Sequence, residues 1–134
     1  MFSIKKGKLL NSEISYCISK MGHTDTLIIA DAGLPIPNGV QRIDLALKRA
    51  IPSFLDTLEA VLSELKVEKV FIAKELPEVN PDFYGKICAM LSGIEIEYIS
   101  HDELKERSGA AKCVIRTGEC SSFANIILQS GVVF

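Results

Sequence analysis

The segment TLIIADAGLP, residues 26–35, decides the fold class of this chain. Its first five residues are almost all apolar, and Asp31-Ala32-Gly33 after them has the composition of a turn. A short apolar run without polar alternation is typical of a strand buried on both faces, as in a parallel sheet covered by helices. We therefore predict a buried parallel strand over residues 26–30, with polar residues at its carboxyl end.

On both sides of this strand, helical and strand-like patterns alternate along the chain. The spacing of apolar residues and the capping residues predict helices that begin at Asn11 or Ser12, at Pro52-Ser53, at Asn80 and, with Ser100 as N-cap, at Asp102. Further strands are expected over residues 42–47, 68–73, 95–99, 112–116 and 124–129. This alternation predicts one α/β domain over residues 1–134, with a mainly parallel central sheet flanked by helices on both faces.

The overall charge and hydropathy limit the classes of partner. The 134 residues carry a formal net charge of -2 and have a pI near 5.7, whereas proteins that bind a phosphate backbone normally present a basic face. No apolar run reaches the roughly 18 residues of a membrane span, and no apolar segment of a signal peptide follows the lysines near the N-terminus. We expect no nucleic acid partner, no membrane partner and a cytoplasmic location.

The cysteines and the glycines show no known cofactor motif. Cys17, Cys88, Cys113 and Cys120 form no C-x-x-C pair and have no spacing that suits zinc, so we expect free thiols in a reducing compartment and no bound metal. Neither glycine-rich phosphate-binding motif occurs in the chain. The sequence therefore predicts a protein that uses no cofactor.

Three polar residues at strand ends are the candidates for chemistry: His23, Asp31 and His101. In a parallel α/β sheet the ligand binds outside the carboxyl ends of the strands, and we expect all three residues to gather there. Histidine exchanges protons near neutral pH, and a neighbouring carboxylate can fix its tautomer. The structural alternatives stay open: either histidine can be a loop or cap residue, and Asp31 can simply form an Asx turn.

Several blocks of sequence, in one order from about Leu10 to Phe134, resemble a known family. The blocks are Gly22-His23-Thr24-Asp25, residues 29–35, Ile43-Asp44-Leu45, Tyr98-Ile99-Ser100-His101, residues 114–119 and residues 124–128. Together they are similar to the D-ribose pyranase branch of the ribose pyranase and L-fucose mutarotase family. Agreement of several blocks over nearly the whole chain is far more specific than any single motif.

The resemblance implies an isomerase that interconverts the pyranose and furanose forms of D-ribose by acid-base opening and reclosure of the ring. It also implies a cytoplasmic, ring-shaped homo-oligomer, commonly a decamer, that uses no cofactor. By position, His23 corresponds to the catalytic proton donor. The positions that correspond to substrate-binding residues are Asp31, His101, Phe123, Ala124 and Asn125. In the resulting hypothesis, His23 donates a proton to the ring oxygen, while Asp31 orients His23 or holds a sugar hydroxyl.

Phe123 departs from the family pattern, which usually has tyrosine at this position. If the tyrosine hydroxyl bonds the sugar, its loss leaves a group unpaired at a cost of about 1 kcal/mol or more. If the ring or the backbone makes the contact, the replacement changes little. The sequence leaves both interpretations open.

Other functions and one structural question also stay open. The alternatives are an L-fucose mutarotase, a sugar-binding module without catalysis, and a phosphoacceptor domain built on Asp31, although no acidic pair that could hold magnesium precedes it. The apolar tail over residues 124–134 requires cover, either from a second subunit or from its own chain.

Overall fold

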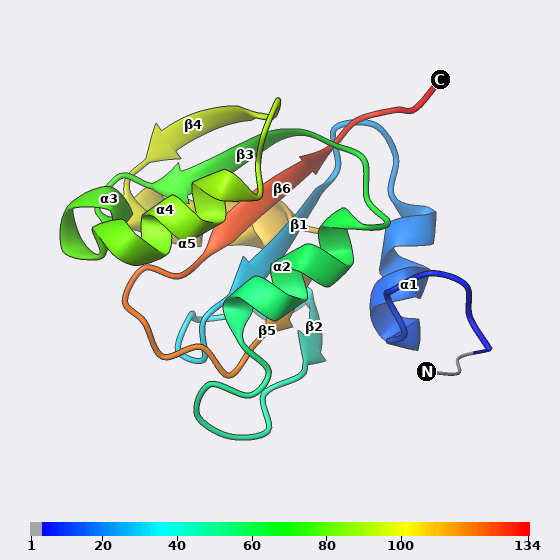
Figure 1. The fold of residues 1–134 in the computed structure, drawn as a ribbon, viewed down its shortest axis with the longest axis horizontal. Helices are drawn as coiled ribbons and strands as arrows, with labels where there is room; N and C mark the ends of the chain where they lie inside the picture. The colour runs from blue at the N-terminus through cyan, green and yellow to red at the C-terminus, as the bar shows by residue number, and fades with distance from the viewer. Residues whose placement is uncertain (1–3) are drawn as a thin grey trace.

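The structure, a computed structural model, describes residues 4–134. Its centre is a six-stranded sheet in the order β2-β5-β1-β6-β3-β4 (Figure 1). The strands are β1 (Thr26–Ala30), β2 (Gln41–Asp44), β3 (Val67–Ala73), β4 (Glu95–Ile99), β5 (Cys113–Arg116) and β6 (Ile126–Ser130). Five strands run parallel, while β6 is antiparallel to its neighbours β1 and β3. The predicted α/β class with a mainly parallel sheet is confirmed.

The segment at residues 26–30 forms the interior strand predicted from its composition. Leu27, Ile28, Ile29 and Ala30 are all 0% exposed, and β1 pairs with β5 on one side and with β6 on the other. Both faces of this strand are covered, so a polar side chain on either face would be buried away from water. The strand is therefore apolar on both faces and shows no polar alternation.

Helices begin where side chains cap their first backbone N–H groups. The helices are α1 (Ser12–Lys20), α2 (Phe54–Leu62), α3 (Leu76–Val79), α4 (Pro81–Ala89) and α5 (His101–Arg107), followed by a short 3-10 helix at Ser108–Ala110. The side chains of Asn11, Ser53, Asn80 and Ser100 accept hydrogen bonds at the starts of α1, α2, α4 and α5. The predicted helix starts are therefore confirmed. The one-turn helix α3 was not predicted, because four residues are too short to show helical periodicity.

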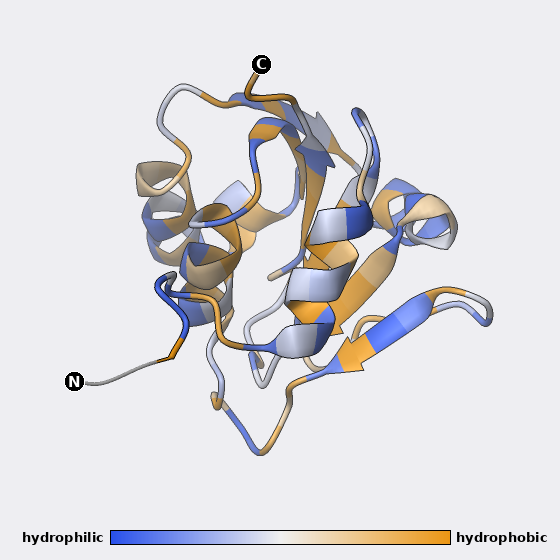
Figure 2. Ribbon diagram, turned by 90° about the vertical axis from the view of Figure 1, so that its right-hand side faces the viewer, coloured by the Kyte–Doolittle hydropathy of each residue, from blue (hydrophilic) through white to orange (hydrophobic). Residues whose placement is uncertain are grey.

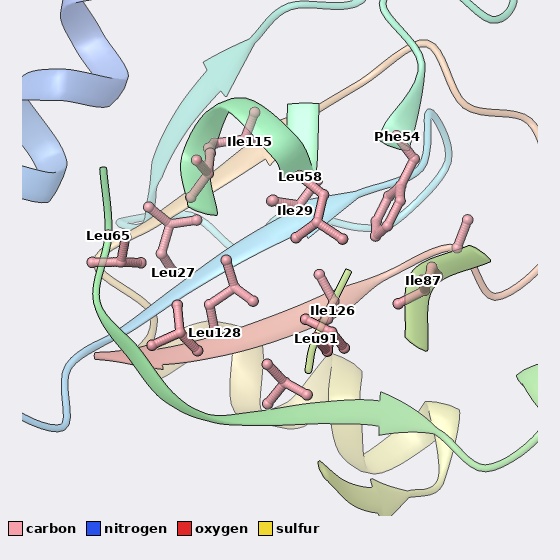
Figure 3. Close-up of a cluster of buried hydrophobic side chains, with 14 of the residues drawn as sticks. Leu27, Ile29, Phe54, Leu58, Leu65, Ile87, Leu91, Ile115, Ile126 and Leu128 are labelled. Atoms are coloured by element: carbon pink, nitrogen blue, oxygen red, sulfur yellow. The ribbon is translucent and has the colours of Figure 1, made fainter. Parts of the chain in front are cut away.

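Helices cover the sheet on both faces. On one face, α1 packs against the strands through Ile14. On the same face, α2 and α4 contribute Phe54, Leu58 and Ile87 (Figure 3). On the other face, Leu104 of α5 packs with the segment that follows β1. Figure 2 shows hydrophobic strands between these layers. Burial of each large apolar side chain contributes about 1.5–3 kcal/mol, so this two-sided core stabilises the sheet edge that carries the polar loops.

Two further observations bear on the expectations from composition. Cys17, Cys88, Cys113 and Cys120 are all free thiols, as predicted. None of the helices in residues 4–134 has both the length and the apolar character that crossing a membrane requires.

Candidate functional site

The polar loops after β1, β4 and β5 meet at the carboxyl edge of the sheet. The loop after β5 leads directly into β6, which begins at the same edge because it runs antiparallel to its neighbours. Together these loops line an open cavity of about 550 Å³. Its polar lining residues include Asp31, His101, Lys105, Glu119 and Ser121.

Asp31 is fixed by the side chain of Asn125. The Asn125 side-chain oxygen accepts the backbone N–H of Asp31 at 2.9 Å, and its Nδ2 donates to Asp31 Oδ2 at 3.2 Å. Asn125 is 0% exposed, so its main contribution to the site is to orient the carboxylate. Asp31 Oδ1 also accepts the N–H of Gly33 at 3.0 Å, so the Asx turn considered from the sequence is present as well. A carboxylate accepts more than two hydrogen bonds, which leaves Asp31 capacity for a ligand in the cavity.

His101, the first residue of α5, also lines the cavity. Its backbone N–H donates to both carboxylate oxygens of Glu75, at 3.1 and 3.2 Å. Its ring packs edge to face on Phe123, with 5.0 Å between the ring centroids. Within residues 4–134, the buried Nδ1 of His101 has no hydrogen-bond partner. A buried polar atom without a partner is costly, and a polar ligand could satisfy it.

Phe123 has an unusual backbone conformation for a bulky residue. Its φ is 59°, a left-handed conformation that costs energy in any residue with a Cβ atom and is often found at functional sites. Ala124, which follows it, is 0% exposed. The strained turn sets the half-buried Phe123 ring against His101 and leads directly into Asn125. The segment 123–125 thus contacts two other predicted site residues, His101 through the Phe123 ring and Asp31 through the Asn125 side chain.

Lys105 and Glu119 line the cavity but were not identified from the sequence. Lys105 lies one helical turn after His101 on α5, and this i, i+4 spacing was the signal that could have revealed it. Glu119 Oε1 accepts the N–H of Phe54 at the start of α2, and its Oε2 accepts the hydroxyl of Ser121. No local pattern could have revealed Glu119, because its partners depend on the approach of α2.

Gly118 allows the loop that carries Glu119 to pass close to residues 48–52. A Cβ atom at Gly118 would lie 2.5 Å from the backbone oxygen of Lys48 and 2.6 Å from that of Ile51. The Gly118 N–H also donates to the backbone oxygen of Pro52 at 2.8 Å. Glycine is therefore required here for the close approach that brings Glu119 to the start of α2.

His23 lies at the opposite, amino edge of the sheet. Its Nε2 is 2.7 Å from Glu68 Oε1, and Glu68 Oε2 accepts a hydrogen bond from Gln129 at 2.8 Å. The hydrogen bond with His23, and next the one from Gln129, hold the pKa of Glu68 below its ordinary value. The expectation that His23 gathers with Asp31 and His101 was wrong for a single chain, because a residue that precedes a parallel strand lies at its amino end.

Apolar residues form part of the surface next to His23. A cavity of about 390 Å³ is lined by Ile18, Met21, His23, Leu65, Val132 and Phe134, among others. Val133 and Phe134 are 84% and 102% exposed. Figure 1 shows the C-terminal segment leaving the end of β6 and running away from the sheet. The end of the tail is thus not covered by its own chain, which was one of the two arrangements considered from the sequence.

Comparisons with known proteins place the sequence and the fold in a known family. Residues 4–133 match the model of the RbsD / FucU transport protein family. Curated proteins called D-ribose pyranase from Clostridium perfringens (strain SM101 / Type A) and Psychromonas ingrahamii are 54% and 48% identical, each covering 98% of this chain and 100% of its own length.

Two solved structures are also similar. Bacillus subtilis RbsD complexed with D-ribose has a TM-score of 0.94 at 46% identity, covering 98% of this chain and 100% of its own. The Streptococcus pneumoniae fucose mutarotase in complex with L-fucose has a TM-score of 0.76 at 26% identity, covering 95% and 96% of the two chains. With a family match over nearly its full length and relatives about half identical in sequence, this chain belongs to the RbsD / FucU transport protein family.

Proposed function

We propose that this chain is a D-ribose pyranase, which interconverts the pyranose and furanose forms of D-ribose by opening and reclosing the sugar ring. The observation that carries the proposal is the cavity at the carboxyl edge, which His101 lines together with the Asp31 carboxylate that Asn125 holds. Acceptors and donors that converge on one small cavity are what recognition of a sugar requires. Relatives named D-ribose pyranase, at 54% and 48% identity over their full lengths, support the same activity.

The chemistry needs one base and one acid. A base removes the proton of the anomeric hydroxyl while an acid protonates the ring oxygen, and reclosure through a different hydroxyl reverses these transfers. The reaction already occurs in water, so positioned acid-base catalysis of roughly a hundred- to ten-thousand-fold suffices. Neither a covalent intermediate nor a cofactor enters this scheme.

In this proposal His23 is the proton donor to the ring oxygen, and Glu68 orients it. An ionised carboxylate can only accept hydrogen bonds, so Nε2 of His23 carries the proton shared with Glu68. With both ring nitrogens protonated, His23 gives its Nδ1 proton to the ring oxygen while water takes the proton of the anomeric hydroxyl, and reclosure reverses both transfers. Asp31 and His101 hold the sugar hydroxyls, and Asn125 keeps Asp31 in place.

A complete site takes residues from two chains. His23 precedes β1 and Asp31 follows it, and the strand from Thr26 to Ala30 alone spans roughly 13 Å. A five-carbon sugar cannot contact both residues of one chain. We therefore propose a homo-oligomer in which His23 of one subunit meets the Asp31 cavity of its neighbour, within the decameric ring implied by the family resemblance.

Exposed apolar groups near His23 support this assembly. Val133 and Phe134 project from the chain beside the cavity that contains His23. Apolar surface of this kind is commonly covered by another subunit.

The free cysteines fit a reducing compartment, and a cytoplasmic location is part of the proposal.

The test is proton NMR saturation transfer between the pyranose and furanose anomeric signals of D-ribose, with and without the protein. We expect faster exchange with the wild-type protein and none with His23→Ala that folds and assembles normally. Full exchange by His23→Ala would contradict the role of His23. Faster anomer exchange of L-fucose but not of D-ribose would indicate an L-fucose mutarotase. Sugar binding without faster exchange would indicate a sugar-binding module without catalysis.

A further inference from the structure

Two cysteines far apart in the sequence meet in the core. Cys17 of α1 and Cys113 at the start of β5 are 96 positions apart, yet their sulfur atoms lie 2.9 Å from each other in a hydrogen bond. Both thiols are free, and the residues are 4% and 0% exposed. This pair belongs to neither the Asp31 cavity nor the His23 cavity.

A small reagent can approach Cys17 from one side. A cavity of about 200 Å³ is lined by Cys17, Lys20, Asp25, Gln41 and Lys112. A liquid water molecule occupies about 30 Å³, so hydrogen peroxide fits this cavity. Cys113 does not line the cavity and lies behind Cys17.

The two thiols have different acidities. The hydrogen bond with Cys113 lowers the pKa of Cys17, with smaller contributions from Lys20 and Lys112, while burial and Asp25 oppose the change. The same hydrogen bond, and next burial, raise the pKa of Cys113. The thiolate is the nucleophilic form of cysteine, and of the two sulfurs only that of Cys17 lines the cavity, so Cys17 is the sulfur that meets peroxide first.

We propose that Cys17 and Cys113 form an oxidisable dithiol, which peroxide converts to an intramolecular disulfide that ties α1 to the sheet. In the first step, the Cys17 thiolate attacks one peroxide oxygen and the O–O bond breaks. This leaves a sulfenic acid on Cys17 and a hydroxide, which takes up the proton that Cys17 released. The sulfur of Cys113 then attacks the sulfur of Cys17, the S–O bond breaks, and the departing hydroxide takes the thiol proton of Cys113. Overall, two thiols and one hydrogen peroxide give one disulfide and two water molecules.

The test uses the full chain with Cys88→Ser and Cys120→Ser, so that only the buried pair remains. The reduced protein is treated with a small molar excess of hydrogen peroxide. We expect the intact mass to fall by two hydrogen atoms and no thiol to react with an alkylating agent in denaturant. Peptide mapping should join the Cys17 and Cys113 peptides. A cross-link over so long a loop should also raise the thermal midpoint by at least about 5 °C.

Single replacements in the same background identify the attacking sulfur. With Cys113→Ala, peroxide should leave a sulfenic acid on Cys17 that dimedone captures. With Cys17→Ala, Cys113 should stay unmodified. The proposal is overturned if the pair keeps two alkylatable thiols at peroxide concentrations that oxidise free cysteine, or if the protein gains oxygen instead of losing hydrogen. The first measurement decides between these outcomes even if an alanine variant fails to fold.

Discussion

Two inactive variants should restore activity to each other if each sugar site is shared between chains. His23→Ala lacks the proposed proton donor, and Asp31→Ala lacks the carboxylate in the cavity at the opposite end of β1. Because roughly 13 Å of strand separates the two ends of β1, no single chain can bring both residues to one sugar. Each variant alone should be inactive for a different reason.

The expected activity of the mixed assembly follows from counting sites. When equal amounts of the two chains assemble at random, about half of the His23 positions and about half of the facing Asp31 positions are wild type. About one site in four then contains both wild-type residues. The mixed assembly should therefore show about a quarter of wild-type exchange per site.

The assay is saturation transfer on D-ribose with assemblies from cells that co-express both chains, each with its own affinity tag. The matched control replaces Asp82, an exposed acidic residue on α4 away from both cavities, by alanine. Asp82→Ala should be active alone and should give about half of wild-type exchange when mixed with His23→Ala. A mixture of His23→Ala and Asp31→Ala that is no more active than its separate components, while the control mixture is active, would refute the shared site.

Three other replacements test the residues that position the site. Asn125→Ala should lower the free energy of unfolding by about 2–4 kcal/mol, measured by urea denaturation, because the buried bonds to Asp31 are lost. It should also weaken ribose binding; unchanged affinity would make Asn125 purely structural. Because the pKa of Glu68 is lowered in the folded protein, its ionised form stabilises the fold above pH 4.5, the ordinary pKa of glutamate. This stabilisation is lost as the pH falls through the lowered pKa of the folded protein. Thermal midpoints of wild type and Glu68→Gln should differ at neutral pH and converge in acid; a constant difference would contradict this. Phe123→Ala should reduce kcat/KM for ribose about two- to tenfold, because the edge-to-face contact that holds His101 is worth about 0.5–1.5 kcal/mol. Phe123→Tyr keeps that contact and should retain activity in the same exchange assay.

Local signals in the sequence were sufficient to predict most elements of the fold, although they missed α3 and placed the ends of β2 and β6 differently. Asn11, Ser53, Asn80 and Ser100 cap helices because capping involves residues only a few positions apart. The apolar run at residues 26–30 predicted a strand covered on both sides, which requires only its own composition. Asp31 and His101 could be assigned to one edge because each directly follows a parallel strand.

Only the tertiary structure decided which side chains meet. The antiparallel direction of β6 brings Asn125 to Asp31, and it depends on pairing with β1 and β3, which no local pattern encodes. The separation of His23 from Asp31, by contrast, follows from local structure, because the two residues lie beyond opposite ends of β1. The Cys17–Cys113 contact joins positions 96 residues apart. The sequence by itself determined local conformation, since that depends on neighbouring residues. Contacts between distant residues were decided by how the helices and the sheet pack together.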